Sequence, residues 1–201
     1  MGDVSHAGTD RYYHDPDNPY AAKTGEVLDE QLRGWLRTCV DRVPVSARIL
    51  EFGSGTGRDA RFLMDLGYRV QTSDYSPVMV GFLHDAGFGD AVVIDVRDFD
   101  DRACWDVVLA DAVFVHFDRP VLADVLSRVH ACLVPSGRLA FTMKAADSPR
   151  VCEDRSGRFF RFTNRADIVD LCAGAGFSRV EVHSQYDHDT AQDWLHVVAF
   201  A

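Results

Sequence analysis

The stretch Ile49-Leu50-Glu51-Phe52-Gly53-Ser54-Gly55-Thr56-Gly57-Arg58-Asp59 decides the fold of this chain. It joins a short apolar run, which predicts a buried strand, to a turn with three alternating glycines and then to a helical pattern that reaches Leu66. Glycines allow positive φ and let backbone N–H groups come close to a ligand. The start of the following helix offers unpaired N–H groups and a partial positive charge. The unit is therefore predicted to bind a nucleotide or nucleoside.

Three related turns compete for this stretch, besides an ordinary strand–turn–helix corner. A phosphate-binding P-loop needs Gly-Lys-Ser/Thr after four spacer residues, and no lysine follows here. The dinucleotide fingerprint Gly-x-Gly-x-x-Gly has its third glycine one place later than this chain. Glu51 precedes the turn; a carboxylate does not favour a phosphate, but it suits a ligand that carries an amine.

Composition limits the remaining possibilities. A chain of 201 residues is expected to form one domain, and no apolar run reaches the length of a membrane span. The polar residues 1–10 lack the features of a signal peptide, so a cytoplasmic location is the default expectation. A net charge of −10 disfavours nucleic acid as a partner. The five cysteines include no Cys-x-x-Cys pair and the histidines no metal-ligand spacing, so no metal and no disulfide framework are expected.

Strand and helix patterns alternate along the chain, which predicts parallel pairing with right-handed crossovers. A polar loop between the last two strands permits an antiparallel hairpin. We expect residues 1–44 to form a tyrosine-rich cover and a helix capped by Thr24, and residues 45–201 to form the main domain. The expected strands are 47–50, 68–74, 91–94, 104–110, 138–143, 177–184 and 195–200, with helices after Ser76-Pro77, over 120–133 and after Thr163-Asn164. Residues 145–163 lack a period and are expected to form a substrate lid.

Four of these strands end in an acid, namely Glu51, Asp74, Asp95 and Asp111. In open α/β sheets the ligand lies beyond the carboxyl ends of the strands. Asp74 follows the second strand, where a carboxylate can accept both hydroxyls of a ribose. An acid at this place serves NAD as well, so Asp74 alone does not select the cofactor; it can also simply cap the helix that begins at Pro77.

Residues 51–57, Asp74, Asp95-Val96, residues 106–111 and Pro135-Ser136-Gly137 resemble, in order and spacing, the motifs of class I S-adenosylmethionine (SAM) methyltransferases. The resemblance covers residues 45–201 and is closest to small bacterial enzymes that act on many acceptors. It implies a Rossmann-like α/β fold: a seven-stranded, mostly parallel sheet with an antiparallel C-terminal strand and helices on both faces. Pro-Ser-Gly replaces the commoner Pro-Gly-Gly. The absence of Asn/Asp-Pro-Pro-Tyr after the fourth strand argues against methylation of DNA bases.

The resemblance implies roles for individual residues. The glycine turn holds the methionine part of SAM, Asp74 the ribose, Asp95 the adenine amine, and Ala110 and Asp111 line the methionine end. The implied cofactor-binding residues are Tyr20, Glu51, Gly53, Ser54, Gly55, Arg58, Asp59, Asp74, Tyr75, Ser76, Met79, Asp95, Val96, Ala110 and Asp111.

Residues for the methyl acceptor are expected after the fourth strand, in the N-terminal cover and in the lid. His116 follows the fourth strand and is the candidate general base, with a backbone-bonded structural histidine as the alternative. The candidate substrate-binding residues are Tyr12, Tyr13, Phe114, Arg155, Arg158 and Phe160, for which core packing or a solvated loop is the alternative. Arginines of the lid can hold a carboxylate or phosphate of the acceptor.

The sequence thus predicts a SAM-dependent methyltransferase that acts on an oxygen or nitrogen of a small molecule, in specialised metabolism. Methyl transfer is an in-line displacement at a sulfonium, so it needs positioning, exclusion of water and, for some acceptors, removal of a proton. The alternatives are an NAD-linked oxidoreductase and a non-catalytic SAM-binding sensor or partner protein. The sequence leaves the acceptor open, and also whether the protein is a monomer or a homodimer.

Overall fold

The computed structural model describes residues 6–17, 19–20, 28–188 and 191–201. Its helical elements are α1 (Ala7–His14), α3 (Glu30–Cys39), α4 (Arg58–Asp65), α5 (Pro77–Asp85), the short 3₁₀ turn η1 (Phe114–His116), α6 (Arg119–Cys132) and α7 (Arg165–Gly174). Its strands are β1 (Arg48–Glu51), β2 (Arg69–Asp74), β3 (Val92–Val93), β4 (Trp105–Ala110), β5 (Leu133–Ala145), β6 (Arg150–Glu153), β7 (Phe159–Thr163), β8 (Arg179–Asp187) and β9 (Gln192–Phe200).

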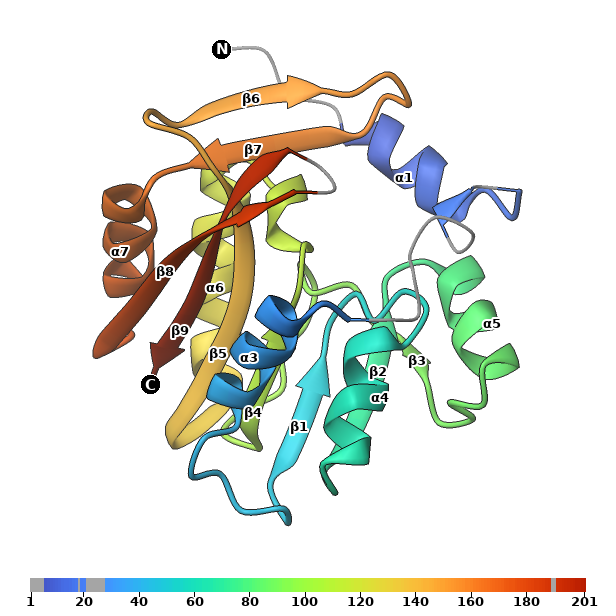
Figure 1. Cartoon of the computed structure of the whole chain (residues 1–201), viewed down its shortest axis with the longest axis vertical. Helices are drawn as coiled ribbons and strands as arrows, with labels where there is room; N and C mark the ends of the chain where they lie inside the picture. Colours follow the sequence, from blue (N-terminus) through green and yellow to red (C-terminus); the bar gives the residue numbers. More distant parts are fainter. Residues whose placement is uncertain (1–5, 18, 21–27, 189–190) are drawn as a thin grey trace.

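The strands that the structure describes form one sheet of nine. Strands β3, β2, β1, β4 and β5 pair in that order and in parallel, while β9 runs antiparallel between β5 and β8. When the added strands β6 and β7 are set aside, the other seven are the predicted sheet with its antiparallel C-terminal strand. The fold expected from the sequence is therefore confirmed (Figure 1).

Helices cover both faces of the sheet, and each face has its own apolar core (Figure 1). Leu36 of α3, Leu63 of α4 and Leu83 of α5 pack in one core. Leu126 of α6 and Leu171 of α7 pack in the other. The central strand β4 contributes to both, which explains why its residues 107–110 are a continuous apolar run rather than an alternating one.

Local capping follows the sequence closely. The Ser76 hydroxyl accepts a hydrogen bond from the Met79 N–H and Pro77 takes the first turn of α5, while Asn164 caps α7 by accepting from the Asp167 N–H. The helix expected after Thr24 begins at Glu30 and is capped by Asp29; Thr24 lies outside the described residues.

The carboxyl end of the sheet differs from the prediction in two places. Residues 150–163, expected to be an aperiodic loop, form an antiparallel β6–β7 hairpin. Strand β7 pairs with Lys144 and Ala145 of β5 and extends the sheet past the end of β4. The N-terminal segment, expected to be a tyrosine-rich cover before the helix at Thr24, itself contains the helix α1, which lies beside this hairpin (Figure 1).

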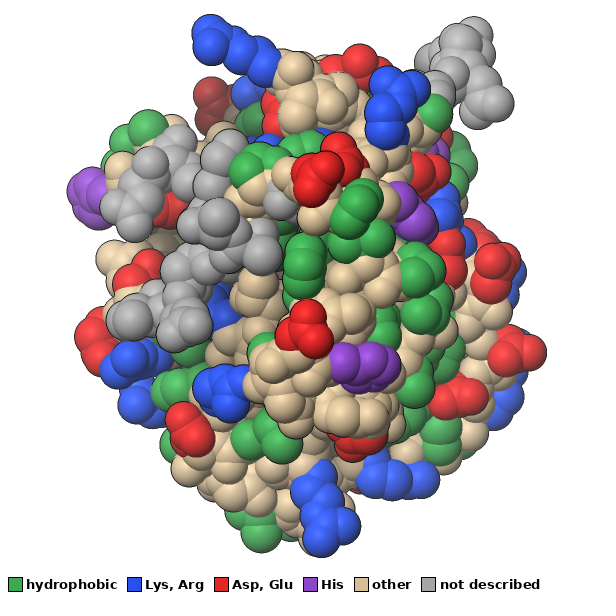
Figure 2. Space-filling view, turned by 90° about the vertical axis from the view of Figure 1, so that its right-hand side faces the viewer, with side chains coloured by type: hydrophobic (Ala, Val, Ile, Leu, Met, Phe, Trp, Pro, Cys, Tyr) green, Lys and Arg blue, Asp and Glu red, His purple; other side chains and the backbone are tan. Residues whose placement is uncertain are grey.

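Charged side chains are dispersed over the surface on the side of α1 and α5, where the described basic groups are interspersed with acidic ones (Figure 2). None of the helices in the described part of the chain is long and apolar enough to cross a membrane.

Candidate functional site

The glycine turn after β1 has the geometry that only glycine adopts without strain. Gly53, Gly55 and Gly57 have φ values of 64°, 55° and 80°. A Cβ on Gly53 would stand 2.4 Å from a Val113 methyl group, and one on Gly55 would stand 2.9 Å from the Tyr20 ring. The turn is therefore a close-fitting cradle of bare backbone, covered by Tyr20.

Four charged side chains meet beside this cradle. Arg58 Nε donates to Asp59 Oδ1 (2.7 Å), and Arg58 Nη2 donates to Asp111 Oδ2 (2.8 Å). Thr142 Oγ1 donates to the other Asp111 oxygen at 2.6 Å. Glu51 is buried next to them, and its Oε2 has no hydrogen-bond partner.

Asp59 and Asp111 therefore share the Arg58 guanidinium, and the Glu51 carboxylate is buried beside them. Burial, reinforced by neighbouring carboxylates, raises the pKa of both Glu51 and Asp59 well above the ordinary values. A buried carboxylate oxygen without a partner is costly. The arrangement is suited to a ligand that brings a positive charge, such as an ammonium group.

Asp74, at the end of β2, is also buried, and its carboxylate bridges two turns. Oδ1 accepts from the Ser76 N–H (2.9 Å), and Oδ2 accepts from the Gly55 N–H (3.3 Å). Burial raises the pKa of Asp74 to about 6, although these N–H groups act against the rise. Asp74 thus joins the glycine turn to the start of α5, and each carboxylate oxygen keeps capacity for a further donor.

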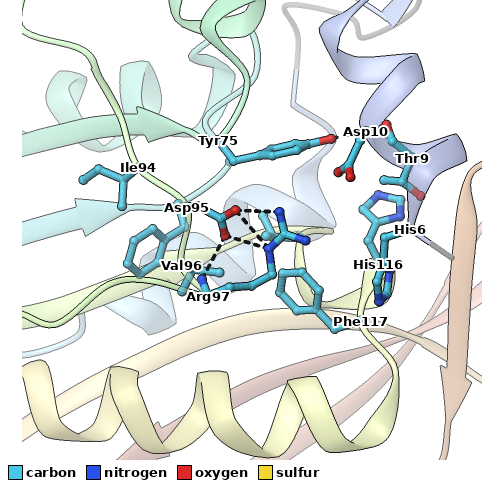
Figure 3. A pocket seen from close by; sticks show the side chains of 13 residues that line it. His6, Thr9, Asp10, Tyr75, Ile94, Asp95, Val96, Arg97, His116 and Phe117 are labelled. Carbon is cyan, nitrogen blue, oxygen red and sulfur yellow. Dashed lines mark hydrogen bonds and ion pairs between the residues drawn. The ribbon is translucent and has the colours of Figure 1, made fainter. Parts of the chain in front are cut away.

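A pocket of about 500 Å³, its open mouth included, lies beyond the carboxyl ends of β1 to β4. Tyr75, Ile94, Asp95, Val96 and Arg97 come from the ends of β2 and β3, and Phe52 and Gly53 from the end of β1. Val113, His116 and Phe117 follow β4, and His6, Thr9 and Asp10 come from the N-terminal segment (Figure 3). The surface of the pocket is largely apolar, with polar groups among its lining residues, as is usual for sites that bind small organic molecules.

Asp95 is held in place by Arg97. Arg97 Nε lies 2.9 Å from both carboxylate oxygens of Asp95, Nη2 lies 2.5 Å from Oδ2, and the Arg97 N–H also donates to Oδ1 (Figure 3). Although partial burial acts against ionisation, these bonds keep the pKa of Asp95 below its usual value. The carboxylate is therefore charged and fixed at the rim of the pocket.

Helix α1 brings Tyr13 to His116. Tyr13 Oη lies 3.2 Å from His116 Nε2, and His116 Nδ1 lies 2.7 Å from the carbonyl oxygen of Phe159. A carbonyl only accepts, so we assign the ring proton to Nδ1, which leaves the lone pair of Nε2 to accept the Tyr13 hydroxyl proton. Burial lowers the pKa of His116 to about 4 and raises that of Tyr13. Both groups are neutral near pH 7.

The β6–β7 hairpin supplies the wall behind this pair. Arg158 donates through Nε and Nη2 to Asp154, its Nη1 lies 3.5 Å from Tyr13 Oη, and its guanidinium lies 4.4 Å from the Tyr12 ring centre. Phe160 packs against the His116 ring, with 4.8 Å between ring centres. The predicted residues Tyr12, Tyr13, His116, Arg158 and Phe160 therefore meet in one place.

Several predicted residues lie elsewhere. Phe114 is fully buried and packs on Phe141, so we withdraw it as a substrate contact. Arg155 is exposed in the turn of the hairpin. Arg161, also suggested for the lid, points away and pairs with Asp167. Ser54, Ser76, Met79 and Ala110 are buried and do not line the pocket.

Sequence reasoning missed the pocket residues His6, Thr9, Asp10 and Arg97. Arg97 is separated from Asp95 by only one residue, and this spacing in the sequence could have indicated the ion pair. The other three residues reach the pocket only because α1 packs against the rest of the protein, and no local sequence pattern predicts that packing. Among the described residues, no group of three His, Cys, Asp or Glu side chains is placed to hold a metal ion.

Comparisons with known proteins agree with this geometry. A family model described as "Methyltransferase domain" matches residues 25–182. A search of curated proteins gave no match.

Many solved structures are similar. The Burkholderia thailandensis 1,6-didemethyltoxoflavin-N1-methyltransferase, with bound 1,6-didemethyltoxoflavin and S-adenosylhomocysteine (SAH), has a TM-score of 0.78 at 21% identity over 98% of this chain and 87% of its own. DhpI in complex with SAH has a TM-score of 0.72 at 20% identity, over 99% and 98% of the two chains. The Haemonchus contortus phosphoethanolamine N-methyltransferase 2, in complex with SAM, has a TM-score of 0.76 at 16% identity, over 99% of this chain and 60% of its own.

The family match spans most of the chain, and the sheet order and glycine turn are those of class I methyltransferases. The protein belongs to this methyltransferase family. It is a SAM-dependent enzyme, and its cofactor is S-adenosylmethionine. The NAD-linked oxidoreductase and the non-catalytic sensor are thereby set aside.

Proposed function

We propose that this enzyme methylates an oxygen or nitrogen atom of a small-molecule acceptor, in specialised metabolism. The observation that carries the proposal is the contact of Tyr13 Oη with His116 Nε2 at the wall of the pocket. An acceptor that attacks through an O–H or N–H group has a proton to lose, and this pair offers a route for it. The B. thailandensis enzyme, an N1-methyltransferase with 1,6-didemethyltoxoflavin bound, is a structural neighbour that methylates a small molecule.

The cofactor residues are proposed from the fit of the site. The bare backbone of residues 53–55 accommodates a close ligand, and the unpartnered Glu51 Oε2 suits the ammonium group of the methionine part. We assign Asp74 to the ribose, and Tyr75, Asp95 and Val96, which line the pocket, to the adenine. When bound, SAM supplies an electrophilic methyl group on a positively charged sulfur. The carboxylates of Asp59, which is buried, and of Asp111, which is partly buried, keep the surroundings of that charge negative.

The proton is proposed to leave the acceptor through Tyr13. The acceptor's O–H or N–H proton passes to Tyr13 Oη as the Tyr13 proton passes to His116 Nε2. The Phe159 carbonyl stabilises the resulting imidazolium through Nδ1. His116 then acts as the base through Tyr13 rather than by direct contact with the acceptor. A histidine with a low pKa can serve here, because the acceptor's proton becomes strongly acidic as its atom bonds to the methyl group. The preformed hydrogen bonds supply the path for that proton.

Residues 1–44 and 145–163 are proposed to enclose the acceptor. Helix α1 is attached to the β6–β7 hairpin by the bond from the Phe159 N–H to Thr9 Oγ1 (2.8 Å). It is attached to the other side of the site by the bond from Ser76 Oγ to the Tyr13 carbonyl (2.6 Å). These few bonds suit a cover that opens for exchange of ligands and excludes water when closed.

The proposal is tested with purified enzyme, SAM and a panel of phenols, carboxylates, phosphates, heteroaromatic amines, nucleic acid and protein. SAH release is measured, and products are identified by mass spectrometry. We expect SAH release with at least one small molecule and a product heavier by one methylene unit. Release with nucleic acid or protein alone would contradict the proposal. Full activity of both Tyr13→Phe and His116→Ala on the acceptor found would contradict the proton route.

A further inference from the structure

Lys144 carries a positive charge near the site and has no role in the reaction proposed above. It lies near the carboxyl end of β5, two residues after Thr142, and so on the same face of the strand as the residue that bonds Asp111. Its side chain is half-buried. It makes no ion pair or hydrogen bond with any residue that the structure describes. A half-buried ammonium without a carboxylate is unusual, because burial of a charge is costly unless it is paired.

Aromatic rings surround Lys144 instead. Its Nζ lies 4.2 Å from the ring centre of Phe160, 5.5 Å from Trp194 and 5.6 Å from Phe162. Ring faces attract the cation but leave its N–H donors unsatisfied. The rings therefore hold the ammonium in place, and its donors remain available to a ligand.

Phe160 connects this lysine with the proton route. The same ring lies 4.8 Å from the His116 ring and 5.2 Å from the guanidinium carbon of Arg158. Two cations and the imidazole are thus arranged around one side chain, and Arg158 Nη1 reaches Tyr13 Oη.

The carboxylates nearby do not neutralise Lys144. Asp154 is engaged by Arg158 through two nitrogens, and Asp187 stands at the end of β8; neither forms an ion pair with Lys144. Burial, followed by the charge of Arg158, lowers the pKa of the Lys144 ammonium. Lys144 is therefore a cation without an ion-pair partner among the described residues, in a protein of net charge −10.

We infer that the acceptor carries an anionic oxygen group, a carboxylate or a phosphate, and that Lys144 and Arg158 bind it beside the Tyr13–His116 pair. This inference rests on the proposed function and narrows the acceptor to oxyanions. The anion fills the unpaired donors of Lys144, and the acceptor's attacking O–H or N–H lies within reach of Tyr13. Phe160 supplies an apolar surface for the rest of the molecule.

The chain contains only two lysines, Lys23 and Lys144, which permits a direct test. Protein labelled with ¹³C at lysine Cε gives two side-chain NMR signals, and the one lost in Lys144→Met is assigned to Lys144. The SAH-saturated protein is titrated with benzoate, with inorganic phosphate and with neutral benzamide. We expect the Lys144 signal to move saturably with benzoate or phosphate and not with benzamide. If benzoate shifts the signal, the site binds a carboxylate; if phosphate shifts it, the site binds a phosphate.

Variants supply the second measurement. Lys144→Met should weaken binding of the effective anion roughly 10–100-fold, as loss of a charge-assisted hydrogen bond predicts, and Lys144→Arg should restore most of it. Arg102→Met removes an exposed charge before β4 and should leave anion binding unchanged. The inference would be overturned if neither anion shifted the Lys144 signal, or if Lys144→Met bound the anion as tightly as wild type. A tenfold loss of SAH affinity in Lys144→Met would also overturn it, because Lys144 would then serve the cofactor.

Turnover separates this inference from the proposed function. If the acceptor found in the panel is methylated with the same kcat/KM by Lys144→Met and by wild type, the function stands and the oxyanion site is refuted. Saturable anion binding at Lys144, with no SAH release from any small molecule, would leave the oxyanion site standing and refute the function.

Discussion

Tyr13 Oη and His116 Nε2 lie 3.2 Å apart, although the two residues are separated by 103 positions in the sequence. The contact joins a helix of the N-terminal cover to the turn that follows the central strand β4. It closes a chain of hydrogen bonds that ends at the Phe159 carbonyl. The N-terminal cover therefore contributes a polar group to the site as well as shielding it.

Removing the Tyr13 hydroxyl is the most direct test of this contact. Tyr13→Phe and His116→Ala should each lower turnover roughly 10²–10⁴-fold, because each interrupts the same proton route, while SAH affinity stays almost unchanged. The double variant should be little worse than either single one, since the residues act as a unit. Turnover and calorimetric SAH affinity are measured, with Tyr186→Phe on β8 as the control. Strictly additive losses would show that the two residues act independently.

The pH dependence of turnover follows from the burial of His116. The neutral ring accepts the proton, and its pKa of about 4 lies far below the near-neutral value suggested by sequence alone. Turnover should therefore show no His116 titration between pH 6 and 8 and should be lost as pH falls through about 4. NMR titration of the His116 ring checks the assignment independently of activity. A ring that titrates near pH 6.5 would contradict it.

The same shift affects stability at acid pH. The unfolded chain binds a proton at His116 near pH 6.5, whereas the folded protein does so only near pH 4. Stability from this group is thus present above pH 6.5 and is lost as pH falls toward 4. His116→Gln should reduce this acid-induced loss, which thermal unfolding between pH 4 and 7 measures. If the stability of His116→Gln fell with pH between 7 and 4 as steeply as that of wild type, the loss of stability would come from other residues.

Glu51 should act in the opposite direction. Above the ordinary glutamate pKa of 4.5, the unfolded chain releases a proton that the folded protein keeps, so stability falls as pH rises through neutrality. Glu51→Gln should therefore stabilise the ligand-free protein at pH 8 by about 1 kcal/mol or more, or roughly 2–4 °C in Tm. It should also weaken SAH binding about tenfold or more, because the ammonium group displaces the Glu51 proton on binding and the glutamine offers no charged carboxylate in its place.

The control for Glu51 is Asp147→Asn, which removes an exposed charge and should change neither quantity. Thermal unfolding and calorimetry at pH 6 and pH 8 distinguish the variants. Full SAH affinity in Glu51→Gln would remove Glu51 from the cofactor site.

The sequence predicted the elements whose causes are local. The turn from Gly53 to Gly57 needs positive φ at alternate residues, and Asn164 caps its helix three positions away, so both are visible in short windows. The β6–β7 hairpin was missed although its turn is also local: Asp154 Oδ1 accepts from the Ser156 and Arg158 N–H groups, and Gly157 has a φ of 82°. The polar and basic composition concealed that signal.

Two features of the site could not be predicted from sequence, because both depend on distant contacts. Helix α1 has eight residues, too few for a stable helix in isolation, and it is held by Thr9 and Tyr13 against the hairpin and the start of α5. Lys144 lies near the end of β5, and the rings of Phe160, Phe162 and Trp194 that converge on it set it apart.

The docking of α1 depends on two glycines. Gly8 meets Gly157 of the hairpin so closely that a Cβ on Gly8 would stand 1.9 Å from the Gly157 carbonyl oxygen. Gly8→Ala should therefore push α1 off the hairpin and draw Tyr13 away from His116. Because a displacement of about 1 Å near the chemistry can cost 10²-fold, turnover should fall roughly 10–100-fold. Global stability should change little, since α1 packs at the edge of the molecule. Turnover, Tm and hydrogen exchange of the α1 amides are measured, and faster exchange is expected.

Gly34→Ala in α3 is the matched control. Its Cβ would meet nothing within 4 Å, so activity should persist and stability should rise by about 0.5–1 kcal/mol. Full turnover of Gly8→Ala with protected α1 amides would mean that the contact between Gly8 and Gly157 is not needed for closure, and that Thr9 and Tyr13 hold the helix by themselves.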